Sequence, residues 1–137
     1  MLDKKNVMEK IVINPWTWQD ELSYVQAVEV REVKGTLYCA GQAAVHADGT
    51  SSNADMRTQL GLAIQNLETV ISEAGYDCRN IVRLTVYTTS SEEFIKGCFD
   101  IFRDFVAKHG MKQAVTLLQV VALNETLNVE LEATVVR

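Results

Sequence analysis

Residues 113–123 limit the possible folds more than any other segment, because this apolar stretch carries apolar side chains at both odd and even positions. Successive side chains of a strand point to opposite faces of a sheet. One face would hold Val115, Leu117, Val121 and Leu123, and the other would hold Ala114, Leu118 and Val120. A strand of this kind has to be covered on both sides.

A second strand is expected at residues 127–136, after a short polar turn. Glu130 and Glu132 stand two positions apart in this strand, so both carboxylates should lie on one face of the sheet. Crowded carboxylates can raise the pKa of one member of the pair and turn it into a general base. The alternative is a solvated or ion-paired edge of the sheet.

Earlier parts of the chain indicate four further strands and two helices. Strands are expected at residues 8–13, 24–31, 36–40 and 81–88, and the Lys34-Gly35 turn predicts a hairpin between the second and the third. Apolar residues at helical spacing predict a helix at residues 53–74. A second helix should begin at a capping box in residues 90–93 and continue to about residue 109. Gly75 and Gly110 are placed to end these helices.

This order of elements predicts an α+β protein with a mixed six-stranded sheet and two helices on one face. Two helices can cover only one face, so the other face is expected to pack against further copies of the chain. Partial exposure of a half-polar sheet is the alternative. A chain of 137 residues without a Ser/Gly-rich linker predicts a single domain over residues 1–137.

Composition narrows the possible partners. With a net charge of −5, the chain lacks the excess of basic residues expected for nucleic-acid binding. No apolar run in the sequence is long enough for a membrane span. Three widely spaced cysteines and the absence of a visible secretory signal favour free thiols in the cytoplasm. His46 and His109 show no metal-ligand spacing, and no motif implies a cofactor.

Several short motifs point to one family. Tyr24 lies in Ser23-Tyr24-Val25-Gln26, Gly41 and Gln42 lie in Ala40-Gly41-Gln42, and Glu130 lies in the last strand. With these residues the sequence resembles, from about Asn14 to Arg137, the reactive intermediate deaminase family of RidA or YjgF-like proteins. The resemblance implies a chorismate-mutase-like subunit, a homotrimer, and clefts between subunits that bind a small molecule.

The resemblance also implies roles for individual residues. Glu130 would be the catalytic residue that orients water for attack on an imine carbon, after which the amino group leaves as ammonia. Gly41 and Gln42 would border the cleft, and the Tyr24 ring would form a wall. From the residues alone, Tyr24 is more often expected to pack on the sheet. Gly41 is also expected at a strand-end bulge, which is compatible with a position at the cleft.

One segment departs from the family pattern. Imine-hydrolysing members carry Pro-Ala-Arg-Ser where this chain has Gln113-Ala114-Val115-Thr116, so Ala114, Val115 and Thr116 occupy substrate-binding positions without the arginine. The arginine would hold a substrate carboxylate through two hydrogen bonds, and each bond to a charged group contributes about 1.5–3 kcal/mol. Without these bonds, activity on 2-iminoacids should be weak or absent. Arg83 or Arg103 could compensate.

Cys98 stands where related deaminases carry an asparagine, and it is counted with the substrate-binding positions. A buried thiol with a packing role is the alternative. We therefore expect a RidA-like protein that hydrolyses an enamine or imine with a non-standard substrate. A trimer of the same fold that binds a small molecule without catalysis is the second hypothesis. RNA cleavage is the third, and the acidic charge disfavours it.

Overall fold

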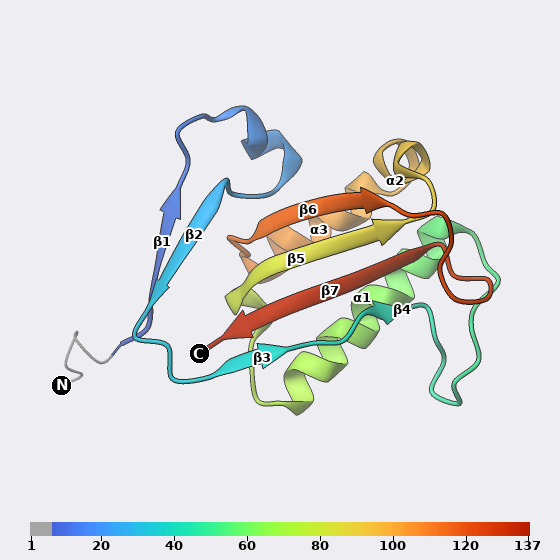
Figure 1. Cartoon of the computed structure of the whole chain (residues 1–137), viewed down its shortest axis with the longest axis horizontal. Coiled ribbons are helices and arrows are strands. Elements are labelled where there is room, and N and C mark those ends of the chain that lie inside the picture. The colour runs from blue at the N-terminus through green and yellow to red at the C-terminus, as the bar shows by residue number, and fades with distance from the viewer. Residues whose placement is uncertain (1–6) are drawn as a thin grey trace.

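The computed structural model describes residues 7–137 and contains a mixed sheet with three α-helices on one face (Figure 1). The strand order is β3-β7-β5-β6, with the short β4 also paired to β7. Only β5 and β6 are parallel; the remaining pairs of this sheet are antiparallel. The elements are β3 (Thr36–Tyr38), β4 (Gln42–Ala43), α1 (Met56–Glu73), β5 (Ile81–Thr88), α2 (Ser91–Gly97), α3 (Phe99–His109), β6 (Ala114–Gln119) and β7 (Val129–Val136). The α+β class is confirmed.

The first two strands form a separate arm. β1 (Glu9–Ile13) and β2 (Ala27–Arg31) pair antiparallel, and the short 3-10 helix η2 (Trp18–Leu22) lies in the segment between them. The predicted hairpin between residues 24–31 and 36–40 is therefore wrong, because β3 pairs with β7. The backbone N–H groups of Lys34 and Gly35 donate to the Arg137 carbonyl, which directs the chain onto the main sheet. The expected six strands thus become five in the main sheet and two in the arm.

The core lies between α1 and the centre of the sheet. Leu60, Leu67 and Ile71 on α1 are fully buried, as are Leu84 on β5 and Leu131 on β7. This arrangement confirms the amphipathic helix that the spacing of apolar residues predicts. Among residues 7–137, no helix is long and apolar enough to cross a membrane.

The predicted second helix is divided in two. The two ends agree with the prediction. Ser90 caps α2, since its side chain accepts a hydrogen bond from the Glu93 N–H, and Gly110 ends α3 in the left-handed conformation. Between them Cys98 leaves the helical conformation, with φ −131°. Gly97, the last residue of α2, has low helix propensity, and this favours a break at that point.

The open face of the sheet is more polar than the sequence pattern predicts. On β6, Val115 and Leu117 pack against the helix-side core, whereas Thr116 and Leu118 are exposed on the other face. β6 ends at Gln119, so Val121 lies outside the strand and is exposed. The predicted length of this strand, residues 113–123, is therefore wrong, although Leu118 does place an apolar side chain on the open face. Covering of the open face by other copies stays a prediction.

Three polar side chains join α1 to α3 on the outer side of the helix layer. Glu68 Oε2 accepts a hydrogen bond from Lys108 Nζ at 2.9 Å and lies 2.6 Å from His109 Nε2. Partial burial raises the pKa of Glu68, but the hydrogen bonds and charges of Lys108 and His109 outweigh this and leave the pKa below its ordinary value. A carboxyl group whose pKa is lowered on folding stabilises the folded state while it is ionised.

We expect Glu68→Gln to lower the free energy of unfolding by about 1 kcal/mol near neutral pH, the low end for charge-assisted bonds because the side chain is still partly exposed. The contribution of Glu68 is present above the unfolded-state pKa of 4.5 and is lost as the pH falls through the lower folded-state value. Urea unfolding measured at about pH 7 and at about pH 3 should therefore show a smaller difference in the free energy of unfolding between the parent protein and Glu68→Gln at the acid pH. Glu73→Gln, an exposed change on the same helix, is the control. Equal differences at both pH values would contradict the assignment.

Candidate functional site

Glu130 and Glu132 lie side by side on the open face of β7, as the alternation of the strand predicts. Their neighbours Val129, Leu131 and Ala133 are buried on the helix side. The Tyr87 hydroxyl on β5 donates a hydrogen bond of 3.1 Å to Glu132 Oε1. This bond, together with partial burial and the charges of Glu132 and Glu130, raises the pKa of Tyr87. The two carboxylates therefore have different surroundings, since Glu132 is held by a phenol.

Gly41 lies against the carboxyl group of Glu130. A Cβ atom placed on Gly41 would stand 2.7 Å from both Cδ and Oε1 of Glu130, closer than real contacts allow. In β4, Gln42 pairs with Leu131 and Ala43 pairs with Glu130 itself. The close approach of the carboxylate therefore favours glycine at this position, and the structure brings Gly41, Gln42 and Glu130 together.

A cavity of about 510 Å³ opens beside Glu130. The Asn66 amide donates to the carbonyls of Ala43 and Val45, each at 2.9 Å, and so fixes the loop that forms one wall. Sequence reasoning missed the wall residues His46, Asn66 and Asn124, because they come from a loop, a helix and a turn with no shared spacing. The lining consists of Gly41, Gln42, Ala43, Val45, His46, Ala47, Asn66, Asn124, Leu127 and Glu130.

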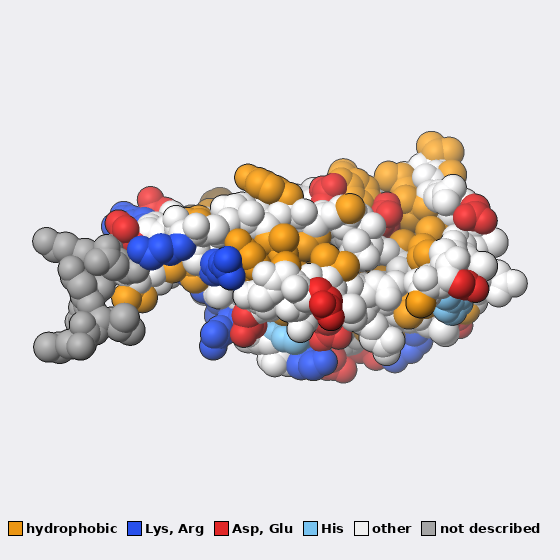
Figure 2. Space-filling view, turned by 90° about the horizontal axis from the view of Figure 1, so that it is seen from below, with side chains coloured by type: hydrophobic (Ala, Val, Ile, Leu, Met, Phe, Trp, Pro, Cys, Tyr) orange, Lys and Arg blue, Asp and Glu red, His pale blue; other side chains and the backbone are white. Residues whose placement is uncertain are grey.

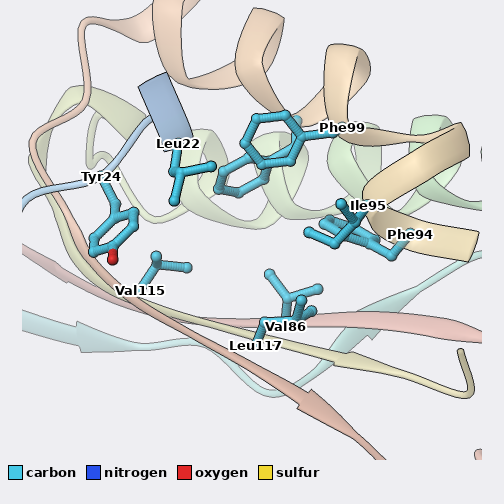
Figure 3. Close-up of a pocket in the computed structure, with 9 residues that line it drawn as sticks. Leu22, Tyr24, Val86, Phe94, Ile95, Phe99, Val115 and Leu117 are labelled. Carbon is cyan, nitrogen blue, oxygen red and sulfur yellow. The ribbon is translucent and has the colours of Figure 1, made fainter. Parts of the chain in front are cut away.

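A second cavity, of about 220 Å³, lies on the helix side of β6 (Figure 3). It contains two of the predicted positions, Tyr24 and Val115. Gln113 holds the Tyr24 segment in place: its side-chain Nε2 donates to the Ser23 carbonyl at 2.8 Å, and its backbone carbonyl accepts from the Val25 N–H at 3.1 Å. Gln113 is fully buried, and a polar residue at the start of an apolar strand was the signal that could have marked it.

Val115 and Glu130, one in each cavity lining, point to opposite faces of the sheet. Val115 is the register partner of Leu84, a buried residue on the helix side. Glu130 is the register partner of Tyr87, whose hydroxyl bonds to Glu132 on the open face. One copy of the chain therefore assembles Tyr24 with Val115, and Gly41 and Gln42 with Glu130, but it does not bring these two groups together.

The other predicted positions stand apart from both cavities. Thr116 lies on the open face, where its hydroxyl accepts from Arg83 Nη1 at 3.3 Å, and Ala114 is the register partner of Arg83. Cys98 is 1% exposed in the core, and burial raises the pKa of its thiol. A thiol of this kind stays protonated and packs as a small apolar side chain. Its burial favours the packing role over the substrate-binding role expected from the family resemblance.

Neither arginine considered as a replacement cation lines the cavity around Val115. Arg83 faces Thr116, and the guanidinium carbon of Arg103 lies 5.0 Å from the centre of the Phe99 ring. Among residues 7–137, no three His, Cys, Asp or Glu side chains gather in a group that could hold a metal ion.

The chain is thus an α+β domain with one cavity beside the Glu130 carboxylate and a second, apolar cavity around Val115. Residues 18–137 match the sequence pattern of the Endoribonuclease L-PSP family. The chain is 29% identical over 114 residues to a RutC family protein of Aquifex aeolicus, covering 83% of this chain and 88% of the relative. It is 25% identical over 115 residues to the Escherichia coli protein named "Putative reactive intermediate deaminase TdcF", covering 83% and 86%.

Solved structures agree with this match. A Rid family protein, YyfB from Yersinia pestis, has a TM-score of 0.77 at 28% identity and covers 93% of this chain and 98% of that chain. Escherichia coli TdcF with bound serine has a TM-score of 0.68 at 26% identity, covering 83% and 87%. The chain therefore belongs to the Endoribonuclease L-PSP family, which confirms the RidA/YjgF-like resemblance.

Proposed function

We propose that the protein forms a homotrimer and hydrolyses an imine or enamine other than the usual 2-iminoacids, in clefts between its subunits. The observation that carries this proposal is the separation of the predicted site residues onto opposite faces of one sheet. A cleft that contains both Glu130 and Val115 then requires two copies, one supplying the Glu130 cavity and the other the Val115 cavity. The relative named "Putative reactive intermediate deaminase TdcF" supports a role in the chemistry of reactive intermediates.

In the proposed reaction Glu130 acts as a general base. It takes a proton from a water molecule whose oxygen attacks the imine carbon, and the C=N bond becomes a C–N single bond with a hydroxyl on the carbon. That proton passes to the nitrogen and gives a carbinolamine. The hydroxyl proton then moves to the amino nitrogen as the C–N bond breaks and the C=O bond forms, and the products are a carbonyl compound and ammonia. Gly41 contributes by allowing the carboxylate to lie against the β4 backbone. General base catalysis by a positioned side chain contributes about 10²–10⁴-fold.

The experiment measures mass and ammonia release on the same preparation. Light scattering should give three times the 15.3 kDa of one chain. Imines that lack a carboxylate, formed in the assay mixture from simple amines, should be hydrolysed faster with the protein than in buffer alone. Hydrolysis of 2-iminobutyrate should show little acceleration. Glu130→Gln should reduce the rate about 100-fold. Glu132→Gln, on the same face of the same strand, is the matched control and should stay within a few fold. A monomer, or equal effects of both changes, would contradict the proposal.

A trimer that binds a small molecule without catalysis is the second candidate. It is favoured by the apolar cavity around Val115, which can hold a ligand without any reacting group nearby. The crystal structure of TdcF with bound serine supports binding of small metabolites by this fold. A bound ligand stabilises the folded state by RT ln(1 + [L]/Kd) and so raises the melting temperature. A ligand that has this effect and is recovered chemically unchanged would favour binding without catalysis.

RNA cleavage, which the family name suggests, is less well supported by the surface. The net charge is −5, and the open sheet face carries Glu130 and Glu132. Figure 2 shows acidic and basic side chains interspersed on one side of the described residues, without a continuous basic stripe there. An RNA-binding surface is expected to concentrate Lys and Arg. We therefore expect the partners of this protein to be small molecules and copies of itself.

A further inference from the structure

The cavity on the helix side of β6 has an almost entirely apolar wall. Val86, Val115 and Leu117 form its sheet side, and Phe94 and Phe99 face them from the helices (Figure 3). Val86 and Phe94 are 1% and 2% exposed and line its buried part. Leu22 and Ile95, the second of which lies beside Phe94 in Figure 3, are 41% and 48% exposed and line its mouth. The cavity is therefore apolar and accessible from the surroundings.

No residue that lines this cavity carries a charge. Tyr24 supplies the single polar side-chain group of the lining, its hydroxyl, and this group lies close to Val115 in Figure 3. Arg103 stacks on Phe99 without belonging to the lining, and Arg83 bonds to Thr116 on the opposite face. Transfer of an ionised carboxylate into such surroundings is strongly unfavourable unless an opposite charge accompanies it.

From this lining we infer that the cavity binds an uncharged ligand with an aromatic or branched aliphatic group, and that the Tyr24 hydroxyl is its hydrogen-bonding anchor. The inference rests on the proposed function, since it assigns a substrate class to the Val115 half of the same cleft. The apolar group lies between Val86, Val115 and Phe94, and the polar head points toward Tyr24. A phenol can donate to a nitrogen or oxygen acceptor and can also accept from an N–H group.

The size of the cavity sets the size of the ligand. A dry apolar cavity of roughly 150 Å³ is enough to hold benzene. The cavity here measures about 220 Å³, so it accommodates one six-membered ring or a branched chain together with a small polar head. Burial of such a group provides affinity without any ionic contact.

The test compares two probes of nearly the same shape, 2-phenylacetamide and phenylacetate, by calorimetry on the full chain. We expect the neutral amide to bind at least tenfold more tightly than the carboxylate. Leu117→Trp should fill the cavity and abolish amide binding. Val70→Trp, a change of the same kind at an exposed position of α1 outside the cavity lining, is the control and should leave amide binding unaltered. Tyr24→Phe should weaken amide binding several-fold.

Three results would overturn the inference: equal or tighter binding of phenylacetate, amide binding that survives Leu117→Trp, and no binding of either probe at millimolar concentration. The last result is also expected if side chains of a second copy fill the cavity. Melting temperatures of each variant show whether the fold is retained. If Leu117→Trp is unstable, Tyr24→Phe, a conservative change within the same cavity, carries the comparison, and unaltered amide binding by that variant would contradict the inference. Because binding is measured without chemistry, amide binding without any imine hydrolysis would support this inference and refute only the proposed catalysis.

Discussion

Replacement of Gln59 by leucine is expected to lower the free energy of unfolding by about 3 kcal/mol, the largest effect of any single polar change considered for this protein. Gln59 is fully buried on α1. Its amide donates to the carbonyls of Ala54 and Thr126, each at 3.0 Å, and its side-chain oxygen accepts from the Asn128 N–H at 2.9 Å. Leucine would fill a similar volume but would leave these partly buried backbone groups without their partner, so the loss is not recovered.

Denaturant unfolding followed by circular dichroism measures this loss. Gln65→Leu is the matched control, because Gln65 is an exposed glutamine on the same helix. It should change the free energy of unfolding by no more than about 0.5 kcal/mol. Because Gln59 connects α1 to the segment before β7, Gln59→Leu should also speed hydrogen exchange around residue 128. A stability close to that of the parent protein would show that the loop carbonyls find other partners.

The second large effect is expected from Gly41→Ala, which should reduce imine hydrolysis about 100-fold while the fold is retained. The new methyl group would stand 2.7 Å from the Glu130 carboxyl carbon, so the carboxylate has to move. A displacement of about 1 Å at a reacting group can cost 10²-fold in rate. Gly41 lies outside the left-handed region, so alanine introduces no backbone strain there. The end of a flexible side chain can move at little cost, which keeps the stability change small.

A double-mutant comparison separates this mechanism from general damage. If Gly41→Ala acts by displacing the Glu130 carboxylate, adding it to Glu130→Gln should lower the rate hardly further. Gly61→Ala is the control: the added methyl group meets no atom within 4 Å, and a glycine-to-alanine change inside α1 should be neutral or slightly stabilising. Additive losses in the double mutant would show that Gly41 acts independently of Glu130.

The sequence predicted the local features of the chain well. The amphipathic pattern located α1, and Gly75 and Gly110 do adopt the left-handed conformation at the ends of α1 and α3. Alternation along β7 correctly placed Glu130 and Glu132 on one face. These features depend on neighbours within a few residues, so short segments of sequence contain the information that determines them.

Strand partners were predicted less well. The Lys34-Gly35 turn suggested a hairpin, but the backbone there bonds to Arg137 at the other end of the chain. The break at Cys98 and the early end of β6 at Gln119 likewise depend on how the helices meet the sheet. Pairing between distant strands is decided by the packing of the whole core, and a turn signal alone does not contain that information.

The sequence by itself determined the residue types of the candidate site: a carboxylate at Glu130, a glycine at Gly41 and an uncharged side chain at Val115. The tertiary structure decided that Val115 and Glu130 lie on opposite faces of the sheet. The physical reason is that the direction of a strand side chain depends on the register with its neighbours and on the side the helices cover. Both are set by contacts between segments that are far apart along the chain.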